Sequence, residues 1–159
     1  ERAIAVYRER FAPVGIFENQ VYPGIPQMLE RLYRRGTRLA VASSKPIGFV
    51  KQILAHFDIE KYFDVVVGSE LDGTRGTKEA VVEEALGRLG ILTMPVTERH
   101  VRCAMTGDRK FDIQGARACG LTGVGVRFGF AEEGELEEAG AEYIAETVAG
   151  LAEFLLRKA

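Results

Sequence analysis

The sequence has little of several features that mark specialised classes of protein. Its 21 basic and 23 acidic residues leave a formal net charge of −2, so nothing in its charge favours nucleic acid or an anionic membrane as a partner. No apolar run approaches the length of a membrane span. It has only two cysteines, Cys103 and Cys119, and neither belongs to a CxxC pair. We therefore expect two reduced thiols in a cytoplasmic protein, rather than a disulfide or a zinc site.

What is present is the composition of an ordinary globular protein. Apolar residues make up 47% of the chain and charged residues 28%, and 159 residues are enough for one domain with a sizeable core. We find no internal repeat and no low-complexity tract. The two histidines, His56 and His100, lack the spacing of metal ligands, and we assign neither a catalytic role.

The apolar periodicity predicts strands that alternate with helices. This order implies right-handed crossovers and a parallel sheet that helices cover on both faces. Residues 95–100 are expected to form a connection, and residues 142–144 either a short strand or an extended link. The strands are expected at 37–43, 64–68, 101–105 and 123–128. The helices are expected at 1–12, 26–35, 46–57, 77–89, 109–119, 132–139 and 147–156.

The stretch from Ala104 to Asp112 carries two carboxylates where a buried strand gives way to a helix. Gly107 allows a tight turn, and Asp108 then lies at the carboxyl end of the strand, where open α/β sheets bind ligands. Asp112 follows four residues later, so both carboxylates can point at one site. Together they suit a hard divalent cation such as Mg²⁺. The other interpretation is that Asp108 caps the helix and Asp112 is a solvated acid of its first turn.

Polar residues at two other element ends are expected at the same edge of the sheet. Ser43 and Ser44 end the first predicted strand, and Lys78 opens the helix after a loop rich in Gly and Thr. A hydroxyl, exposed backbone amides and an ammonium can bind a phosphate, and the paired acids can hold its counter-cation. Singly, such a lysine is more often solvated and a Ser-Ser pair more often a turn or cap. Their order on consecutive strand ends favours phosphate binding, with Lys45 and Arg109 as charges at the margin.

This pattern resembles the haloacid dehalogenase (HAD) superfamily of phosphohydrolases and, within it, the phosphoglycolate-phosphatase group. The likeness rests on Ser43-Ser44-Lys45 at a strand end, then Lys78, then Gly107-Asp108-Arg109-Lys110-Phe111-Asp112. The flanking segments 22–25, 126–130 and 139–144 agree with the same group. The likeness covers nearly the whole chain from Val21 onward.

The resemblance implies a fold, an activity and a set of roles. The fold would be a Rossmann-like (HAD-like) three-layer α/β sandwich with a mainly parallel sheet. The usual mechanism passes through an aspartyl-phosphate that water then cleaves. Ser43 and Lys78 would take catalytic roles, and with Ser44 they would bind the phosphoryl group, whose charge Lys78 neutralises. Asp108 would bind Mg²⁺, and Asp112 would assist directly or through water.

The nucleophile motif of the family is missing from the expected place. The motif is Asp-x-Asp-Gly-Thr at the end of the first strand, and no such strand precedes residue 37. Residues 70–74 read Glu-Leu-Asp-Gly-Thr, but they lie between the Ser43 and Lys78 elements rather than before them. We interpret them as a loop with turn chemistry at Asp72-Gly73.

The missing strand has structural consequences. In the family it lies at the centre of the sheet, between the strands that end at Ser43 and Asp108, so both would lose a ladder partner here. The family's helical cap domain falls between that strand and Val21. We therefore expect residues 1–20 to be a remnant of the cap with a linker, and residues 21–159 to be the core domain. The chain is expected to be part of a longer protein and catalytically incomplete as it stands.

The leading hypothesis is a Mg²⁺-dependent phosphatase of a small phosphorylated metabolite, with phosphoglycolate as the candidate substrate and a nucleophile outside this chain. Phosphosugar mutase, pyrophosphatase and nucleotidase activities remain open within the same fold. The alternative from another class is a non-catalytic HAD-like module that binds phosphate or a protein partner. A receiver-like domain ranks last, because it needs an acidic cluster at the end of the first strand. We expect a monomer or a homodimer.

Overall fold

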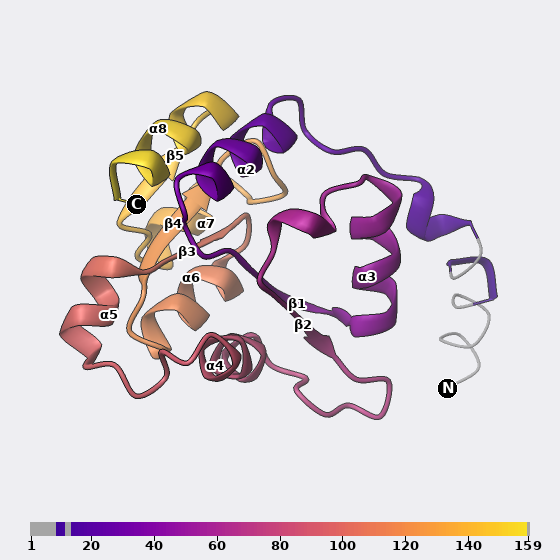
Figure 1. The fold of residues 1–159 in the computed structure, drawn as a ribbon, viewed down its shortest axis with the longest axis horizontal. Coiled ribbons are helices and arrows are strands. Elements are labelled where there is room, and N and C mark those ends of the chain that lie inside the picture. Colours follow the sequence, from indigo (N-terminus) through magenta and orange to yellow (C-terminus); the bar gives the residue numbers. More distant parts are fainter. Residues whose placement is uncertain (1–8, 12–13, 159) are drawn as a thin grey trace.

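The structure is a computed structural model that describes residues 9–11 and 14–158 (Figure 1). Most of the predicted first helix lies outside these residues; residues 9–11 are helical. The strands are β1 (Ala40–Pro46), β2 (Val65–Ser69), β3 (Ala104–Gly107), β4 (Thr122–Val126) and β5 (Tyr143–Ala145). The helices are α2 (Ile25–Arg34), α3 (Ile47–His56), α4 (Lys78–Arg88), α5 (Val96–Arg102), α6 (Lys110–Ala118), α7 (Glu135–Glu138) and α8 (Val148–Lys158), with short 3₁₀ turns η1 (Gly15–Phe17) and η2 (Glu60–Tyr62).

The strands form two parallel sheets rather than one. β1 pairs with β2, and β3, β4 and β5 pair in that order. Within the described residues no ladder joins β1 to β3. The predicted parallel α/β fold is confirmed, and the break lies between the two strands where a central strand is expected to be missing.

Helices cover both faces of the strands, as expected for a three-layer fold (Figure 1). Successive side chains of a strand point to opposite faces. On β1, Val41 packs with α2 and α3, whereas Ala42 packs toward α4. On β4, Val124 and Val126 join the core beneath α2 and α8. The helices α2, α3 and α8 therefore lie on one side of the strands and α4 and α6 on the other, with clusters of apolar side chains packed beneath each layer.

The pair α4 and α6 links the two sheets in the absence of a strand ladder. α4 contacts β1, β2 and α6, while α6 contacts β3 and β4. Val82 and Leu86 of α4 are buried against Ala116 of α6. The start of α4 is fixed as predicted, because the Thr77 hydroxyl accepts a hydrogen bond from the Ala80 backbone N–H at 3.2 Å. This capped start sets the position of Lys78 at the first turn.

The predicted strand at 101–105 and the connection at 95–100 are wrong in detail. Residues 96–102 form α5, and the strand begins only at Ala104. Val101 lies on the solvent side of that helix, 67% exposed, and an ion pair of 2.7 Å joins Glu98 to Arg102 one turn later. Basic residues in the last turn also suit the helix dipole. The apolar residues between 101 and 105 therefore belong partly to α5 and partly to β3, and the sequence pattern does not indicate the boundary between the two.

Other boundaries differ from the prediction as well, and the strand expected at 123–128 ends already at Val126. β1 begins at Ala40 and continues through Ser43 and Ser44 to Pro46, with a register shift after Ala42. The reason is local, because a residue before proline avoids the helical region, and Lys45 therefore stays extended. α7 is shorter than expected, since it begins after Gly134, whose φ of 79° is left-handed.

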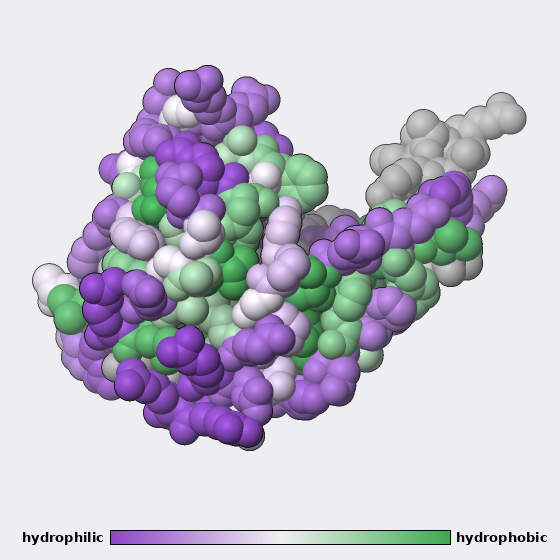
Figure 2. All heavy atoms as spheres, turned by 90° about the horizontal axis from the view of Figure 1, so that it is seen from above, coloured by the Kyte–Doolittle hydropathy of each residue, from purple (hydrophilic) through white to green (hydrophobic). Residues whose placement is uncertain are grey.

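In the part of the chain that the structure describes, none of the helices is both long enough and apolar enough to cross a membrane. Seen from above, apolar residues reach the surface in the middle of the molecule and hydrophilic residues frame them (Figure 2). The most exposed large apolar side chains include Phe111 and Phe130. Phe111 lies in the segment that carries the two predicted metal ligands, and the Phe130 backbone contacts Asp108 of that segment.

Candidate functional site

Lys78 lies at the carboxyl end of the gap between the two sheets. Its side chain is only 16% exposed, and its ammonium is paired with the Asp112 carboxylate at 2.8 Å. The same ammonium donates a hydrogen bond of 3.1 Å to the Ala42 carbonyl oxygen on β1. It thus connects β1 to the first turn of α6. The interpretation of Lys78 as a solvated helix residue is therefore wrong.

A glycine on α6 makes room for this lysine. A Cβ atom on Gly115 would lie 2.7 Å from the Cγ atom of Lys78, closer than nonbonded carbons approach. The close packing of α4 on α6 therefore requires the missing side chain at residue 115. The position of the Lys78 ammonium therefore depends on how closely α4 packs on α6.

Asp112 is buried, with only 8% of the residue exposed. Its Oδ1 atom faces Lys78, and its Oδ2 atom accepts a hydrogen bond of 3.0 Å from the Arg109 backbone N–H. A Cβ atom on Gly107 would overlap the Asp112 side chain, so the turn at residue 107 needs glycine. The interpretation of Asp112 as a solvated first-turn acid is therefore wrong.

Asp108 follows β3 directly and does not cap α6, whose N-cap is Arg109. Its Oδ2 atom accepts a hydrogen bond of 3.0 Å from the Phe130 backbone N–H. A Cβ atom on Gly129 would overlap the Asp108 side chain, so the loop after β4 passes very close. No hydrogen bond between described residues uses the Oδ1 atom of Asp108, and this oxygen remains available to a ligand.

Ser43 and Ser44 lie beside the carbonyl that Lys78 contacts. The Ser43 hydroxyl accepts a hydrogen bond of 3.1 Å from the Lys45 backbone N–H, and its own proton remains free to be donated. Ser44 is exposed, and its carbonyl accepts a hydrogen bond of 2.8 Å from the Ser69 hydroxyl. Among the described residues no hydrogen bond joins either serine to the two aspartates. Lys78 is the residue that connects the serine segment of β1 with the aspartate segment at the start of α6.

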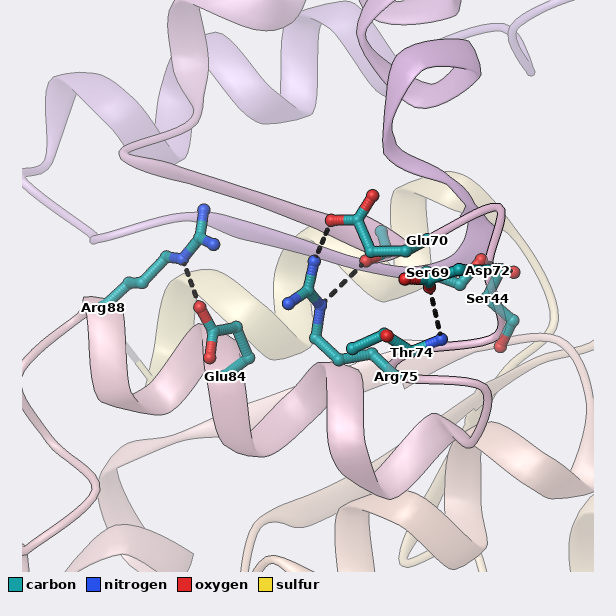
Figure 3. A network of polar contacts seen from close by, with 9 residues as sticks. Ser44, Ser69, Glu70, Asp72, Thr74, Arg75, Glu84 and Arg88 are labelled. Atoms are coloured by element: carbon teal, nitrogen blue, oxygen red, sulfur yellow. Dashed lines mark hydrogen bonds and ion pairs between the residues drawn. The ribbon is translucent and has the colours of Figure 1, made fainter.

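The loop after β2 borders Ser44 and is closed by its own hydrogen bonds (Figure 3). The Thr74 backbone N–H donates to Asp72 Oδ1 at 2.8 Å and lowers the pKa of that carboxyl. Arg75 pairs with Glu70 and donates from Nε to the Gly68 carbonyl at 3.2 Å. The turn expected at Asp72-Gly73 is present. The structuring role of Arg75, whose φ is +56°, has no signal in the sequence.

Glu135 is a further charged residue at this edge that the sequence reasoning missed. Its side chain is only 8% exposed. One oxygen accepts from the Lys110 backbone N–H at 2.8 Å and from Arg109 Nε at 2.9 Å, and the other accepts from the Glu132 backbone N–H at 3.1 Å. These donors, the Lys110 N–H foremost, lower the pKa of Glu135 from 4.5 to about 2. Nothing in the sequence distinguishes Glu135 from its neighbours Glu132 and Glu133, so these contacts cannot be predicted from the sequence.

The donor set fits a magnesium ion that keeps part of its hydration shell. Among residues 9–11 and 14–158, no three His, Cys, Asp or Glu side chains gather closely enough to hold a metal ion by themselves. Asp108 offers one free carboxylate oxygen, and Asp112 is committed to Lys78 and Arg109. Mg²⁺ is commonly bound by one or two carboxylates together with waters and phosphate oxygens. Asp108 is thus the stronger candidate for direct contact, and Asp112 for an indirect role.

A hollow of about 730 Å³ lies elsewhere, lined by Val96, His100, Arg117 and Glu142 among others. It opens at the amino ends of β4 and β5, where His100 Nε2 lies 3.1 Å from a Glu142 carboxylate oxygen. Ligand sites of open α/β sheets lie outside the carboxyl ends of the strands. The Lys78 edge, and not this hollow, is therefore the candidate active site.

Known proteins are similar to this chain in sequence and in fold. The model of the haloacid dehalogenase-like hydrolase family matches residues 1–120. A 5'-nucleotidase of Pseudomonas aeruginosa is 42% identical over 134 residues, which are 84% of this chain and 58% of that protein. Tyrosine-protein kinase PtkA of Mycobacterium tuberculosis is 41% identical over 130 residues, 82% of this chain and 42% of the kinase. A phosphoglycolate phosphatase of Aquifex aeolicus is 29% identical over 120 residues, 76% of this chain and 53% of that enzyme.

A solved structure agrees with these relatives. The crystal structure of a predicted phosphatase from Clostridium acetobutylicum superposes with a TM-score of 0.89 and 43% identity, over 98% of this chain and 68% of that one. The chain spans only about half the length of the curated relatives that it matches. The resemblance to the superfamily and to its phosphoglycolate-phosphatase-like members is confirmed. The chain belongs to the haloacid dehalogenase-like hydrolase family and comprises part of its α/β domain.

Proposed function

We propose that the protein is a Mg²⁺-dependent phosphoric monoester hydrolase that acts on a small phosphorylated metabolite. The observation that carries this proposal is the buried Lys78 ammonium, held between Ala42 and Asp112 at the mouth of the gap between the sheets. A cation held this firmly at a strand edge can oppose the charge of a phosphoryl group without reorganising. Two named relatives, a nucleotidase and a phosphoglycolate phosphatase, support phosphate ester hydrolysis.

Each predicted site residue has a role in this proposal. The Ser43 hydroxyl, whose proton is free, would donate to a phosphoryl oxygen beside Lys78. Asp108 would hold Mg²⁺ through its free oxygen, and Asp112 would keep the Lys78 ammonium in place. Ser44, an exposed residue, would offer its hydroxyl at the margin of the site. A bound Mg²⁺ would supply further positive charge opposite the phosphoryl oxygens.

The nucleophile in this proposal comes from a strand that would pair between β1 and β3. Both strands end at the candidate site, and within the described residues neither has a partner on the side of the gap. A strand inserted there would satisfy the ladder groups of two buried strands. Its carboxyl end would also lie beside Lys78, where an aspartate could attack the phosphoryl group.

Two substrate classes have specific support. Phosphoglycolate follows from the phosphoglycolate-phosphatase-like relatives. A nucleoside monophosphate is the second candidate, because the relative named a 5'-nucleotidase is 42% identical, against 29% for the phosphoglycolate phosphatase. The non-catalytic phosphate-binding module remains the alternative, since the described residues contain no strand in the gap.

The test is phosphate release by the full-length protein from phosphoglycolate and from a panel of nucleoside monophosphates, with Mg²⁺ and with EDTA. We expect Mg²⁺-dependent release, and a loss on the order of a hundredfold for Asp108→Asn. Glu133→Gln, an exposed residue outside the site, is the matched control. Turnover that Asp108→Asn leaves unchanged would overturn the metal assignment. Saturable phosphate binding without any turnover would support the non-catalytic alternative instead.

A further inference from the structure

We propose that Glu135 is a positioning residue that holds the loop between β3 and α6 in the geometry needed to bind the metal ion. This inference rests on the proposed function, because it assumes that Asp108 is the ligand. Among the described residues no hydrogen bond joins Glu135 to Asp108 itself. It acts on the two residues that follow, accepting hydrogen bonds from the Arg109 side chain and from the Lys110 backbone.

The segment from Gly129 to Glu135, which we call the clamp segment, grips this loop at two points. At one end the Phe130 backbone N–H donates to Asp108 Oδ2 at 3.0 Å, with Gly129 packed against the same side chain. At the other end Glu135 accepts from Lys110 and Arg109. The two contacts fall on consecutive residues of the loop, because the first holds Asp108 and the second holds Arg109 and Lys110 directly after it. A shift of either end would therefore change the direction in which the free oxygen of Asp108 points.

The clamp segment is itself closed and anchored. The second oxygen of Glu135 accepts the Glu132 backbone N–H, so the carboxylate is fixed to its own segment as well. The next residue, Leu136, is completely buried, and it packs with Ile113 of α6 in an apolar cluster. A Cβ atom on Gly125 of β4 would lie 2.9 Å from Leu136 Cδ1, so the strand also fits closely against this side chain.

This apolar anchor separates positioning from folding. Because Leu136 holds α7 to the core, Glu135→Gln keeps the shape of the side chain and the burial around it. The neutral amide of the variant still offers one oxygen, but it replaces a charge-assisted contact to Arg109 with a weaker one. We therefore expect the loop between β3 and α6 to become more mobile in Glu135→Gln, while the protein keeps its fold.

The experiment measures binding of Mn²⁺ alone, used as a paramagnetic substitute for Mg²⁺, to the full-length protein and to three variants. Glu135→Gln is expected to weaken Mn²⁺ binding on the order of tenfold, with a thermal transition that is lower but still cooperative, because the variant lacks the stabilising charge of Glu135. Glu133→Gln removes the same charge from an exposed position of the clamp segment and should bind as the unchanged protein does. Asp108→Asn should lose binding altogether.

The activity of the full-length protein gives a second readout. Glu135→Gln should raise the Mg²⁺ concentration for half-maximal turnover on the order of tenfold, with kcat at saturating Mg²⁺ within about twofold. Should Glu135→Gln fail to fold, Arg109→Gln removes the other partner of the ion pair and should raise the same concentration in the same direction.

Two results overturn the proposal, and they can be told apart. If Glu135→Gln binds Mn²⁺ as tightly as the unchanged protein while Asp108→Asn does not, Glu135 has no positioning role and the proposed function stands. If Asp108→Asn also binds normally, the metal assignment fails and the role of Glu135 fails with it. A fall in kcat and in thermal stability at an unchanged half-saturating Mg²⁺ concentration would show a purely structural residue, which also contradicts the proposal.

Discussion

Lys78 and Asp112 form the ion pair around which the candidate site is built. Both side chains are largely buried, and the pair lies at 2.8 Å. The Ala42 carbonyl oxygen accepts a further hydrogen bond from the ammonium, and the Arg109 backbone N–H donates a hydrogen bond to the second oxygen of the carboxylate. Such a pair needs each of these contacts, because a buried charge without partners is costly. The pair therefore matters less for the free energy of unfolding than for the fixed position that it gives to the Lys78 ammonium.

Replacing the lysine tests this arrangement at the scale of the residue. We expect Lys78→Met to lower kcat on the order of a hundredfold or more, because the phosphoryl charge loses its fixed counter-charge. It should also lower the free energy of unfolding by about 3 kcal/mol, because Asp112 keeps a buried charge without its partner. Steady-state kinetics and urea unfolding measure the two effects. Lys51→Met, at an exposed position of α3, should change neither; full activity in Lys78→Met would exclude the assigned role.

Acid unfolding reports on Glu135. Its pKa is lowered from 4.5 to about 2 in the folded protein, so the folded state favours the charged form. The stabilisation is therefore complete above pH 4.5 and is lost as the pH falls toward about 2. We expect the free energy of unfolding of Glu135→Gln to depend less steeply on pH within this window than that of the unchanged protein. Parallel curves for the two proteins would show that Glu135 has an ordinary pKa.

At the scale of the elements, the contact between α4 and α6 positions Lys78. A Cβ atom on Gly115 would lie 2.7 Å from Lys78 Cγ, whereas one on Gly87 of α4 would lie 4.0 Å from its nearest neighbour. Both glycines lie within helices, so the pair separates helix propensity from packing. The geometry predicts opposite effects for the same substitution at the two positions.

We expect Gly115→Ala to lower the free energy of unfolding by about 1–3 kcal/mol, because α4 and α6 must move apart. It should also lower kcat, since Lys78 moves with them. Gly87→Ala should instead raise the free energy of unfolding by up to about 1 kcal/mol, through the better helix propensity of alanine, without any change in kcat. Equal effects of the two substitutions on stability and turnover would contradict the packing argument.

Local signals explain which elements the sequence predicts correctly. The capped start of α4 depends on Thr77 and its own backbone, so it is visible in a short stretch. The region of α5 is different, because residues 96–102 have no strong apolar period and border a real strand. The role of Glu135 depends on partners 25 and 26 residues away. Contacts of that kind arise from the tertiary fold, and no spacing within the sequence indicates them.

At the scale of the whole molecule, the break between the two sheets is the main feature. The pattern of strands and helices predicts the parallel fold, and the family resemblance predicts the place of the break between β1 and β3. The core on both faces nevertheless closes around each sheet, and α4 and α6 bridge the gap from one side. The candidate site thus lies at one end of this gap, and a further strand in the gap would supply the proposed nucleophile.

The most direct test of this account compares phosphate release by the full-length protein with release by the 159-residue chain alone, both with Mg²⁺. We predict that the full-length protein hydrolyses a phosphate monoester and that the 159-residue chain does not, because the proposed nucleophile lies on a further strand that would fill the gap. Equal turnover by the two proteins would contradict the account, since the nucleophile would then lie among these residues.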